Sequence, residues 1–180
     1  IAQVINIPKG MKVTQNWLKE QATRQHDTAT LQTLAKLISK DTLLCNGALS
    51  CFMAQYELLA KYHGAVFNPA TDKEVEKATR QYDDYKNYDW NKGFFYSATR
   101  LEKDMFATDF TNVTKLSIPA YFMEGRHDWN VPAVLVDSFV AKLNAPAKKI
   151  IWFENSGHGP LEEEPAKFNE AVSNLLQQQD

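Results

Sequence analysis

The sequence predicts an α/β protein in which a mostly helical region precedes parallel strands joined by crossover helices. Two observations predict this class. Apolar residues recur at helical spacing within residues 9–115, and residues 116–180 alternate two short apolar runs with two amphipathic helices. Such alternation is typical of parallel strands with helical connections. Hydrophobic residues make up 44% of the 180 residues and charged residues 23%, which is enough apolar material for a packed core.

The amino-terminal segment Ile1–Ile7 is short, rich in β-branched residues and followed by Pro8, so we expect residues 1–8 to end a core strand. Helical spacing starts near Thr14, and residues 9–115 are predicted to form one helical domain. Gly64 is predicted to end one helix, and Thr71–Glu74 has the capping-box pattern that begins another. The apolar faces are expected at Leu31, Leu34, Ala35 and Ile38; Phe52, Tyr56, Leu59 and Ala60; Val75, Ala78, Tyr82 and Tyr85; and Phe94, Ala98, Leu101 and Met105.

Residues 116–180 form the third predicted segment, with strands at Ala120–Glu124 and Lys149–Phe153 and helices at Ala133–Leu143 and Pro165–Leu176. Two parallel strands do not make a stable sheet by themselves, because parallel sheets need both faces and both edges covered. We therefore expect further strands from an upstream segment. The two helices are expected to bury Leu135, Phe139 and Leu143, and Phe168, Val172, Leu175 and Leu176.

Composition argues against several classes of partner. The net charge of -2 provides no basic field for nucleic acid or an anionic membrane, and no apolar run approaches membrane-spanning length. Cys45 and Cys51 lack a CxxC partner, so we expect small buried side chains rather than a disulfide framework or a zinc site. No signal-peptide pattern is seen at the start, and a reduced, cytoplasmic setting is favoured. No metal or organic cofactor is expected.

Asp128 and His158 are the candidate catalytic residues. Each follows one of the two predicted strands, where an open α/β sheet places its chemistry. A hydrolytic triad needs an acid that orients a base, and a base that takes the proton of a nucleophile. Asp128 fits the acid and His158 the base. Gly125 and Gly157 are expected to permit tight chain reversals after the strands.

Each candidate also has an ordinary structural interpretation. Asp128 can cap the helix that starts near Pro132, and His158 can be a polar loop residue. The run Glu162–Glu164 is expected to be solvated and to favour the start of the following helix. Ser156 is not expected to be a nucleophile, because no strand–turn–helix elbow surrounds it.

Two stretches carry a family resemblance: Pro119-Ala-Tyr-Phe-Met-Glu-Gly-Arg-His-Asp128, and Trp152-Phe-Glu-Asn-Ser-Gly-His-Gly-Pro160 with Glu163-Glu-Pro165 after it. With these motifs the chain resembles the proline-iminopeptidase-like branch of the α/β-hydrolase superfamily. The resemblance is strong over about the last 60 residues and looser over the helical part. In that family the triad order is Ser, Asp, His, and Asp128 precedes His158 here.

The resemblance implies the C-terminal part of an α/β-hydrolase sheet plus a mostly helical cap inserted after the sixth strand. The nucleophilic Ser and the oxyanion hole would lie upstream of Ile1, since the chain contains no Gly-x-Ser-x-Gly. The implied reaction is ester or amide hydrolysis through an acyl-enzyme, on a small molecule or a short peptide. An aminopeptidase acting on N-terminal proline is one such activity.

Two other interpretations stay open from the sequence. The chain can be a non-catalytic fragment or module that folds by dimerisation or by docking to a partner, for which a free sheet edge would be the pairing surface. The fold can also carry an Asp nucleophile instead of Ser. In the leading interpretation, the chain needs the missing N-terminal hydrolase half, or a homodimer partner, in order to act.

Overall fold

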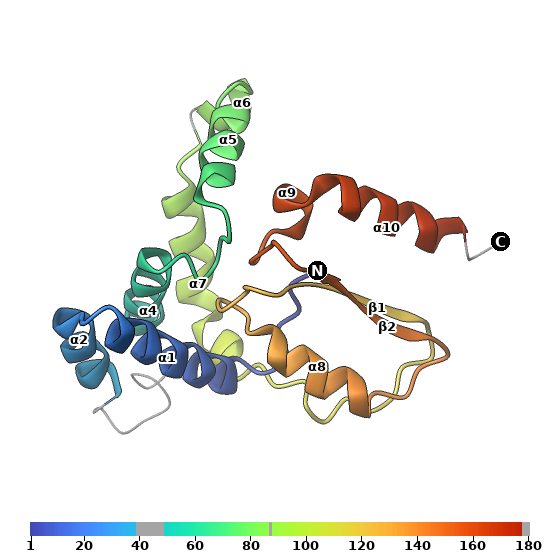
Figure 1. Cartoon of the computed structure of the whole chain (residues 1–180), viewed down its shortest axis with the longest axis horizontal. Coiled ribbons are helices and arrows are strands. Elements are labelled where there is room, and N and C mark those ends of the chain that lie inside the picture. Colours follow the sequence, from blue (N-terminus) through green and yellow to red (C-terminus); the bar gives the residue numbers. More distant parts are fainter. Residues whose placement is uncertain (39–48, 87, 178–180) are drawn as a thin grey trace.

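The computed structural model of the chain describes residues 1–38, 49–86 and 88–177 (Figure 1). The helical part lies beside a small parallel sheet, with α8 and α10 on either side of the strands. The elements are α1 Ile7–Arg24, α2 Thr28–Ile38, α4 Leu49–Lys61, α5 Pro69–Thr79, α6 Asp83–Lys86, α7 Trp90–Phe106, β1 Ala120–Gly125, α8 Ala133–Lys142, β2 Lys148–Phe153, α9 Pro160–Glu163 and α10 Pro165–Gln177.

The helical part is organised around α1, which packs against α2, α4 and α7. Its centre is formed by leucines that are almost completely buried, Leu18, Leu34 and Leu59. In Figure 1, α5, α6 and much of α7 project away from this bundle. The helices predicted around these apolar positions form as α2, α4 and α7, whereas the helix predicted to run from Thr71 through Tyr85 is divided into α5 and α6. The predicted apolar faces are only partly buried, because Leu34, Leu59 and Ala98 are buried but Tyr56 and Leu101 are exposed.

Residues 1–6 differ from the prediction, because they form no strand and α1 begins at Ile7. The segment still lies beside β1, where the N–H of Ala2 donates to the carbonyl of Met123 at 3.1 Å. Asn6 caps α1, since its side chain accepts the N–H of Lys9 at 2.7 Å. Pro8 thus belongs to the first helical turn, where its fixed φ is favourable, rather than marking the end of a strand.

Two predicted helix ends also shift. The cap of α5 is Asn68, whose side chain accepts the N–H of Ala70, so the pattern at Thr71–Glu74 is not a capping box. After α4, the left-handed residue is His63, with φ of 56°, and not Gly64. Gly64 is required for space instead, because a Cβ there would lie 2.3 Å from a Leu59 methyl and 2.6 Å from the Trp17 ring.

The sheet consists of β1 and β2 in parallel, in a register that pairs Ala120 with Lys148 and Gly125 with Phe153. Helix α8 covers one face with a core of Ile5, Leu135, Val136 and Val140, against which Phe122 and Ile150 pack. On the other face, Phe168 of α10 packs on Phe153, with ring centroids 6.0 Å apart. The parallel α/β class predicted from the sequence is confirmed for this part of the chain.

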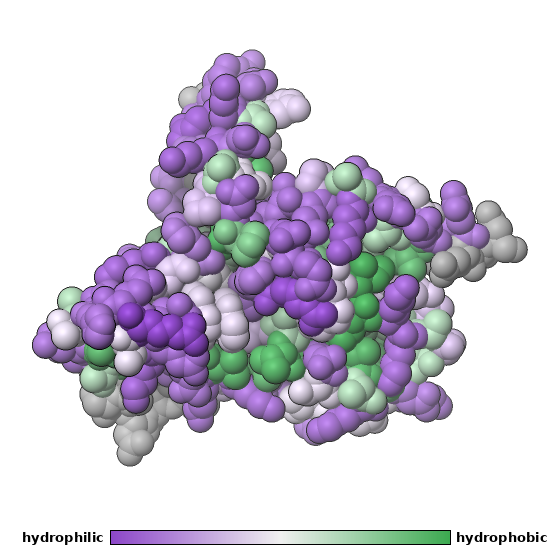
Figure 2. All heavy atoms as spheres, viewed as in Figure 1, coloured by the Kyte–Doolittle hydropathy of each residue, from purple (hydrophilic) through white to green (hydrophobic). Residues whose placement is uncertain are grey.

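Burial of the outer helices is less complete than predicted. Phe139 is only partly buried, no residue of α10 is fully buried, and Leu176 is 63% exposed. Figure 2 shows hydrophobic residues at the surface where the strands lie between α8 and α10. A two-stranded sheet is too narrow to cover both helices, which explains why the amphipathic pattern overestimates burial.

The cysteine prediction is wrong for Cys51, which is disulfide-bonded. The missing CxxC motif argued against zinc and against a multi-bridge framework, but it does not test for a single bridge. A disulfide at Cys51 does not favour a reduced compartment, contrary to the prediction from cysteine usage. Cys45 lies outside the described residues.

Among the helices described, none combines the length and the apolar character needed to cross a membrane. The division into domains at residues 8 and 115 stays a prediction.

Candidate active site

The loops after β1 and β2 bring Asp128 and His158 together. Because the strands are adjacent and parallel, their carboxyl ends meet at one edge of the sheet. The Nδ1 atom of His158 lies 2.9 Å from Oδ2 of Asp128, within hydrogen-bond distance. The Asp128 side chain is fully buried, whereas 43% of the His158 side chain is exposed. The pair therefore has a shielded acid and an accessible imidazole.

The second oxygen of Asp128 stabilises its own loop. Oδ1 accepts the backbone N–H groups of Asn130, at 2.9 Å, and of Val131, at 2.8 Å. The residue that caps α8 is Pro132, with no side-chain cap. The alternative that Asp128 caps this helix is thus wrong in detail, because Asp128 holds the preceding turn and leaves Oδ2 for His158.

The charge of Asp128 acts on the base. Hydrogen bonding to Asp128 raises the pKa of His158 above its usual value, and the partial burial of the imidazole opposes this effect. An imidazole whose protonated form is stabilised in this way is suited to accept a proton during a reaction.

The two glycines allow the loops to approach each other more closely than any side chain permits. A Cβ at Gly125 would lie 1.9 Å from the carbonyl oxygen of Gly157, and a Cβ at Gly157 would lie 2.3 Å from that of Ala65. These distances are far inside van der Waals contact. Close packing of backbone against backbone, more than chain reversal, therefore requires glycine at both positions.

Two glutamates that were expected to be solvated instead hold the base loop. Glu164 accepts the Asn155 N–H at 2.9 Å and the Ser156 hydroxyl at 2.7 Å, and Glu163 accepts the Gly157 N–H at 2.5 Å. The sequence analysis did not predict that Glu163 and Glu164 would hold this loop. The one signal in the sequence was that two carboxylates follow the predicted loop at residues 154–158 by only a few residues. The completely buried Ser156 has no open path to a substrate in this arrangement.

A cavity of about 360 Å³ opens beside the base. It lies between the helical part and the loop after Asp128, and His158 forms part of its wall together with Met11, Phe52, Met105 and Val131. Its size and apolar lining are typical of small-molecule sites at the junction of two structural layers.

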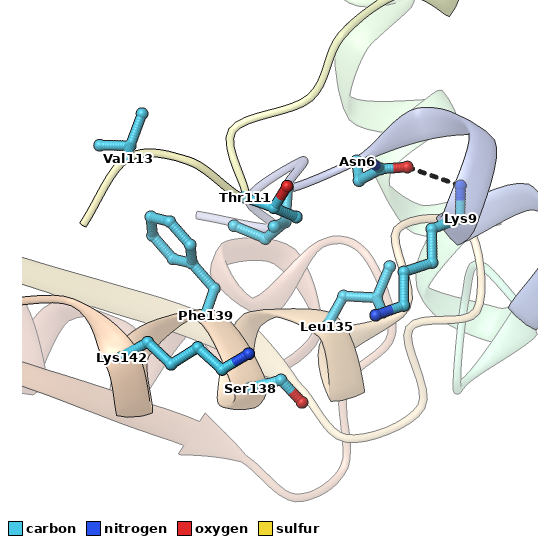
Figure 3. A pocket seen from close by; sticks show the side chains of 9 residues that line it. Asn6, Lys9, Thr111, Val113, Leu135, Ser138, Phe139 and Lys142 are labelled. Atoms are coloured by element: carbon cyan, nitrogen blue, oxygen red, sulfur yellow. Dashed lines mark hydrogen bonds between the residues drawn. The ribbon is translucent and has the colours of Figure 1, made fainter.

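A second pocket, shown in Figure 3, is too small to compete with it. Its volume is about 60 Å³, against about 360 Å³ for the cavity beside His158. Lys9 of α1, Thr111, and Ser138 and Lys142 of α8 contribute to its lining, and His158 does not. Within residues 1–38, 49–86 and 88–177, no group of three His, Cys, Asp or Glu residues is placed to hold a metal ion.

Glu124, near the end of β1, is a buried carboxyl that the sequence did not single out. Its Oε1 accepts the Gln3 N–H at 3.2 Å, and Oε2 has no hydrogen-bond partner among the described residues. Burial raises the pKa of Glu124 from its usual 4.5 to about 7. Asp128 adds to the increase and His158 opposes it, so Glu124 lies within the electrostatic reach of the pair.

This shift predicts how stability depends on pH. The folded state binds the Glu124 proton more tightly than the unfolded state, so this group lowers stability as pH rises from 4.5 to about 7. The full effect is on the order of 3 kcal/mol for one group. We expect Glu124→Gln to be more stable than the wild type at pH 8 but not at pH 4, as measured by urea unfolding. The exposed Glu170→Gln is the control, and a Glu124→Gln difference that does not change with pH would contradict the assignment.

Comparisons with known proteins bear on the family. No family model matches the chain. It is 35% identical over 82 residues to the "Probable aminopeptidase YbaC" of Bacillus subtilis, and this match covers 45% of the chain but only 26% of that protein. A solved structure, "The structure of an alpha/beta fold family hydrolase from Bacillus anthracis str. Sterne", matches 81% of the chain and 48% of its own length, with 17% identity and a TM-score of 0.40. The shared sequence relates part of this chain to a protein named as an aminopeptidase, and the chain spans only about a quarter of that protein's length. The parallel strands joined through α8 belong to the α/β class.

Proposed function

We propose that this chain supplies the acid and the base of a serine hydrolase that cleaves esters or amides through an acyl-enzyme. The observation that carries the proposal is the contact of 2.9 Å between Oδ2 of the buried Asp128 and Nδ1 of the partly exposed His158. Acid and base lie on neighbouring post-strand loops, the arrangement that this chemistry needs in an open sheet.

In the proposed mechanism, Asp128 holds the Nδ1–H of His158 and thereby directs Nε2 at the nucleophile. His158 takes the proton of the nucleophile at Nε2 and later gives it to the leaving group. The buried charge of Asp128 stabilises the imidazolium that forms between these steps. The nucleophilic Ser and the oxyanion donors are proposed to lie upstream of Ile1, in the N-terminal half of the hydrolase.

For the substrate, we propose a small molecule or a short peptide with an apolar group. The cavity of about 360 Å³ beside His158, with Phe52 and Met105 in its lining, would receive that group. The name of the Bacillus subtilis relative supports an aminopeptidase within this class. An N-terminal proline has a compact apolar ring, which suits such a cavity.

The test uses the full-length polypeptide that contains this chain. We expect it to hydrolyse p-nitrophenyl butyrate and the p-nitroanilides of proline and alanine. If the enzyme is an aminopeptidase, acetylating the amino group of the anilide will abolish cleavage. Cleavage of the ester but of neither anilide would support an esterase instead, and a folded protein that cleaves none of these substrates would overturn the proposal.

A further inference from the structure

A short segment of the helical part contacts both loops of the candidate site. Residues 64–68, which connect α4 to α5 and are called the strap here, supply two backbone acceptors. The carbonyl of Gly64 accepts the N–H of Trp129, next to Asp128, at 2.8 Å. The carbonyl of Ala65 accepts the N–H of His158 itself, at 2.7 Å. The acid loop and the base loop are thus both hydrogen-bonded to neighbouring residues of the strap.

Glu163 makes a further connection between the strap and the base loop. Its Oε1 accepts the N–H of Asn68, at the end of the strap, at 2.9 Å. Its Oε2 accepts the N–H of Gly157, one residue before the base, at 2.5 Å. One carboxylate therefore joins two backbone segments that lie 89 residues apart in the sequence (157 − 68 = 89). Hydrogen bonds to an ionised acceptor are stronger than neutral ones, which suits a carboxylate to this task.

We propose that Glu163 is a positioning residue that fixes the loop of His158 against the strap. The position of the helical part relative to this loop then sets the orientation of the His158 imidazole. This inference rests on the proposed function, because it assigns Glu163 a role in orienting His158 as the base. Glu163 acts through Gly157 and the backbone of His158 and touches no reacting atom. A displacement of about 1 Å in a catalytic group lowers rates by about 10²-fold, so an anchor next to the base has a measurable effect.

The chemistry of the two bonds defines the test. Both oxygens of Glu163 face N–H donors, and Glu163→Gln replaces one acceptor by a donor, so one of the two bonds must be lost. Glu162→Gln is the matched control, because it removes the same charge one residue earlier from an exposed side chain. Glu162 also raises the pKa of His158, so this control measures the electrostatic part of the change separately.

The experiment measures the rate of labelling of the full-length protein by a fluorophosphonate probe, together with hydrogen exchange over residues 155–158. For Glu163→Gln we expect the maximal labelling rate to fall about tenfold or more, with the probe concentration at half-maximal rate within twofold of wild type. Exchange at Gly157 should become faster. Labelling and exchange that match Glu162→Gln would overturn the inference.

Two further outcomes are distinguishable. If Glu163→Gln does not fold, Glu163→Asp keeps the charge but is one methylene too short for both bonds, and it should show the same loss of maximal rate. A wild-type protein that never reacts with the probe would overturn the proposed function and the role in aiming the base. In that case, faster exchange at Gly157 in Glu163→Gln would still show that Glu163 holds the loop.

Discussion

Replacing His158 by Ala is expected to lower the kcat of the full-length enzyme by about 10⁴-fold or more, the usual result of removing the base of a triad. Without the imidazole, no other side chain of the described residues is hydrogen-bonded to Asp128 and able to accept the proton of the nucleophile. The measurement is the rate of ester or anilide hydrolysis under saturating substrate. Thermal unfolding should change little, because 43% of the His158 side chain is exposed.

His127→Ala is the control for this prediction. His127 stacks on Phe67, with ring centroids 4.2 Å apart, and its Nε2 lies 3.1 Å from the carbonyl of Glu154, so its environment is separate from the Asp128 contact. We expect its kcat to stay within about tenfold of wild type, as for a residue outside the reacting groups. Full activity in His158→Ala, or equal losses in both variants, would show that His158 is not the base.

Asp128→Asn is expected to lower kcat by about 10³- to 10⁴-fold, because the neutral amide no longer stabilises the imidazolium and favours the wrong tautomer. The turn should survive, since an amide oxygen can replace Oδ1 as acceptor for the N–H groups of Asn130 and Val131. The two functions of Asp128 are thus separable: the substitution removes the charge and keeps the hydrogen bonds of the turn.

The same variant makes a prediction about acidity. The bond to Asp128 is the main cause of the raised pKa of His158, so Asp128→Asn should lower that pKa, as followed by NMR of the imidazole protons. Asp137→Asn, an exposed change on α8, should leave it unaltered. An unchanged His158 pKa in Asp128→Asn would show that the 2.9 Å contact does not form in solution.

The C-terminal part of the fold was predictable because its signals are local and agree with one another. The strand patterns at Ala120 and Lys149 predicted β1 and β2 to within one residue, and α8 and α10 were predicted equally closely. Acid and base follow the strands directly, so parallel pairing alone brings Asp128 and His158 to one edge. That step needs no knowledge of the helical part.

Other features depend on tertiary structure and were predicted poorly. Pro8 is compatible both with the end of a strand and with the first turn of a helix. The helix forms because the Asn6 side chain caps its amino terminus. Gly64 is required by the volume of Trp17, which no local pattern shows. Glu163 matches a helix-start pattern, but it joins the nearby Gly157 to Asn68, a residue 95 positions away, and no local pattern shows the second contact.

The most direct test of the central claim is to label the full-length protein with a fluorophosphonate probe and to map the modified residue by mass spectrometry. If Asp128 and His158 serve a nucleophile in the N-terminal half, a single adduct should form on a Ser upstream of Ile1 in the wild type and be lost in His158→Ala. No adduct on a folded wild-type protein, or an adduct within residues 1–180, would contradict the claim that Asp128 and His158 serve a nucleophile in the N-terminal half.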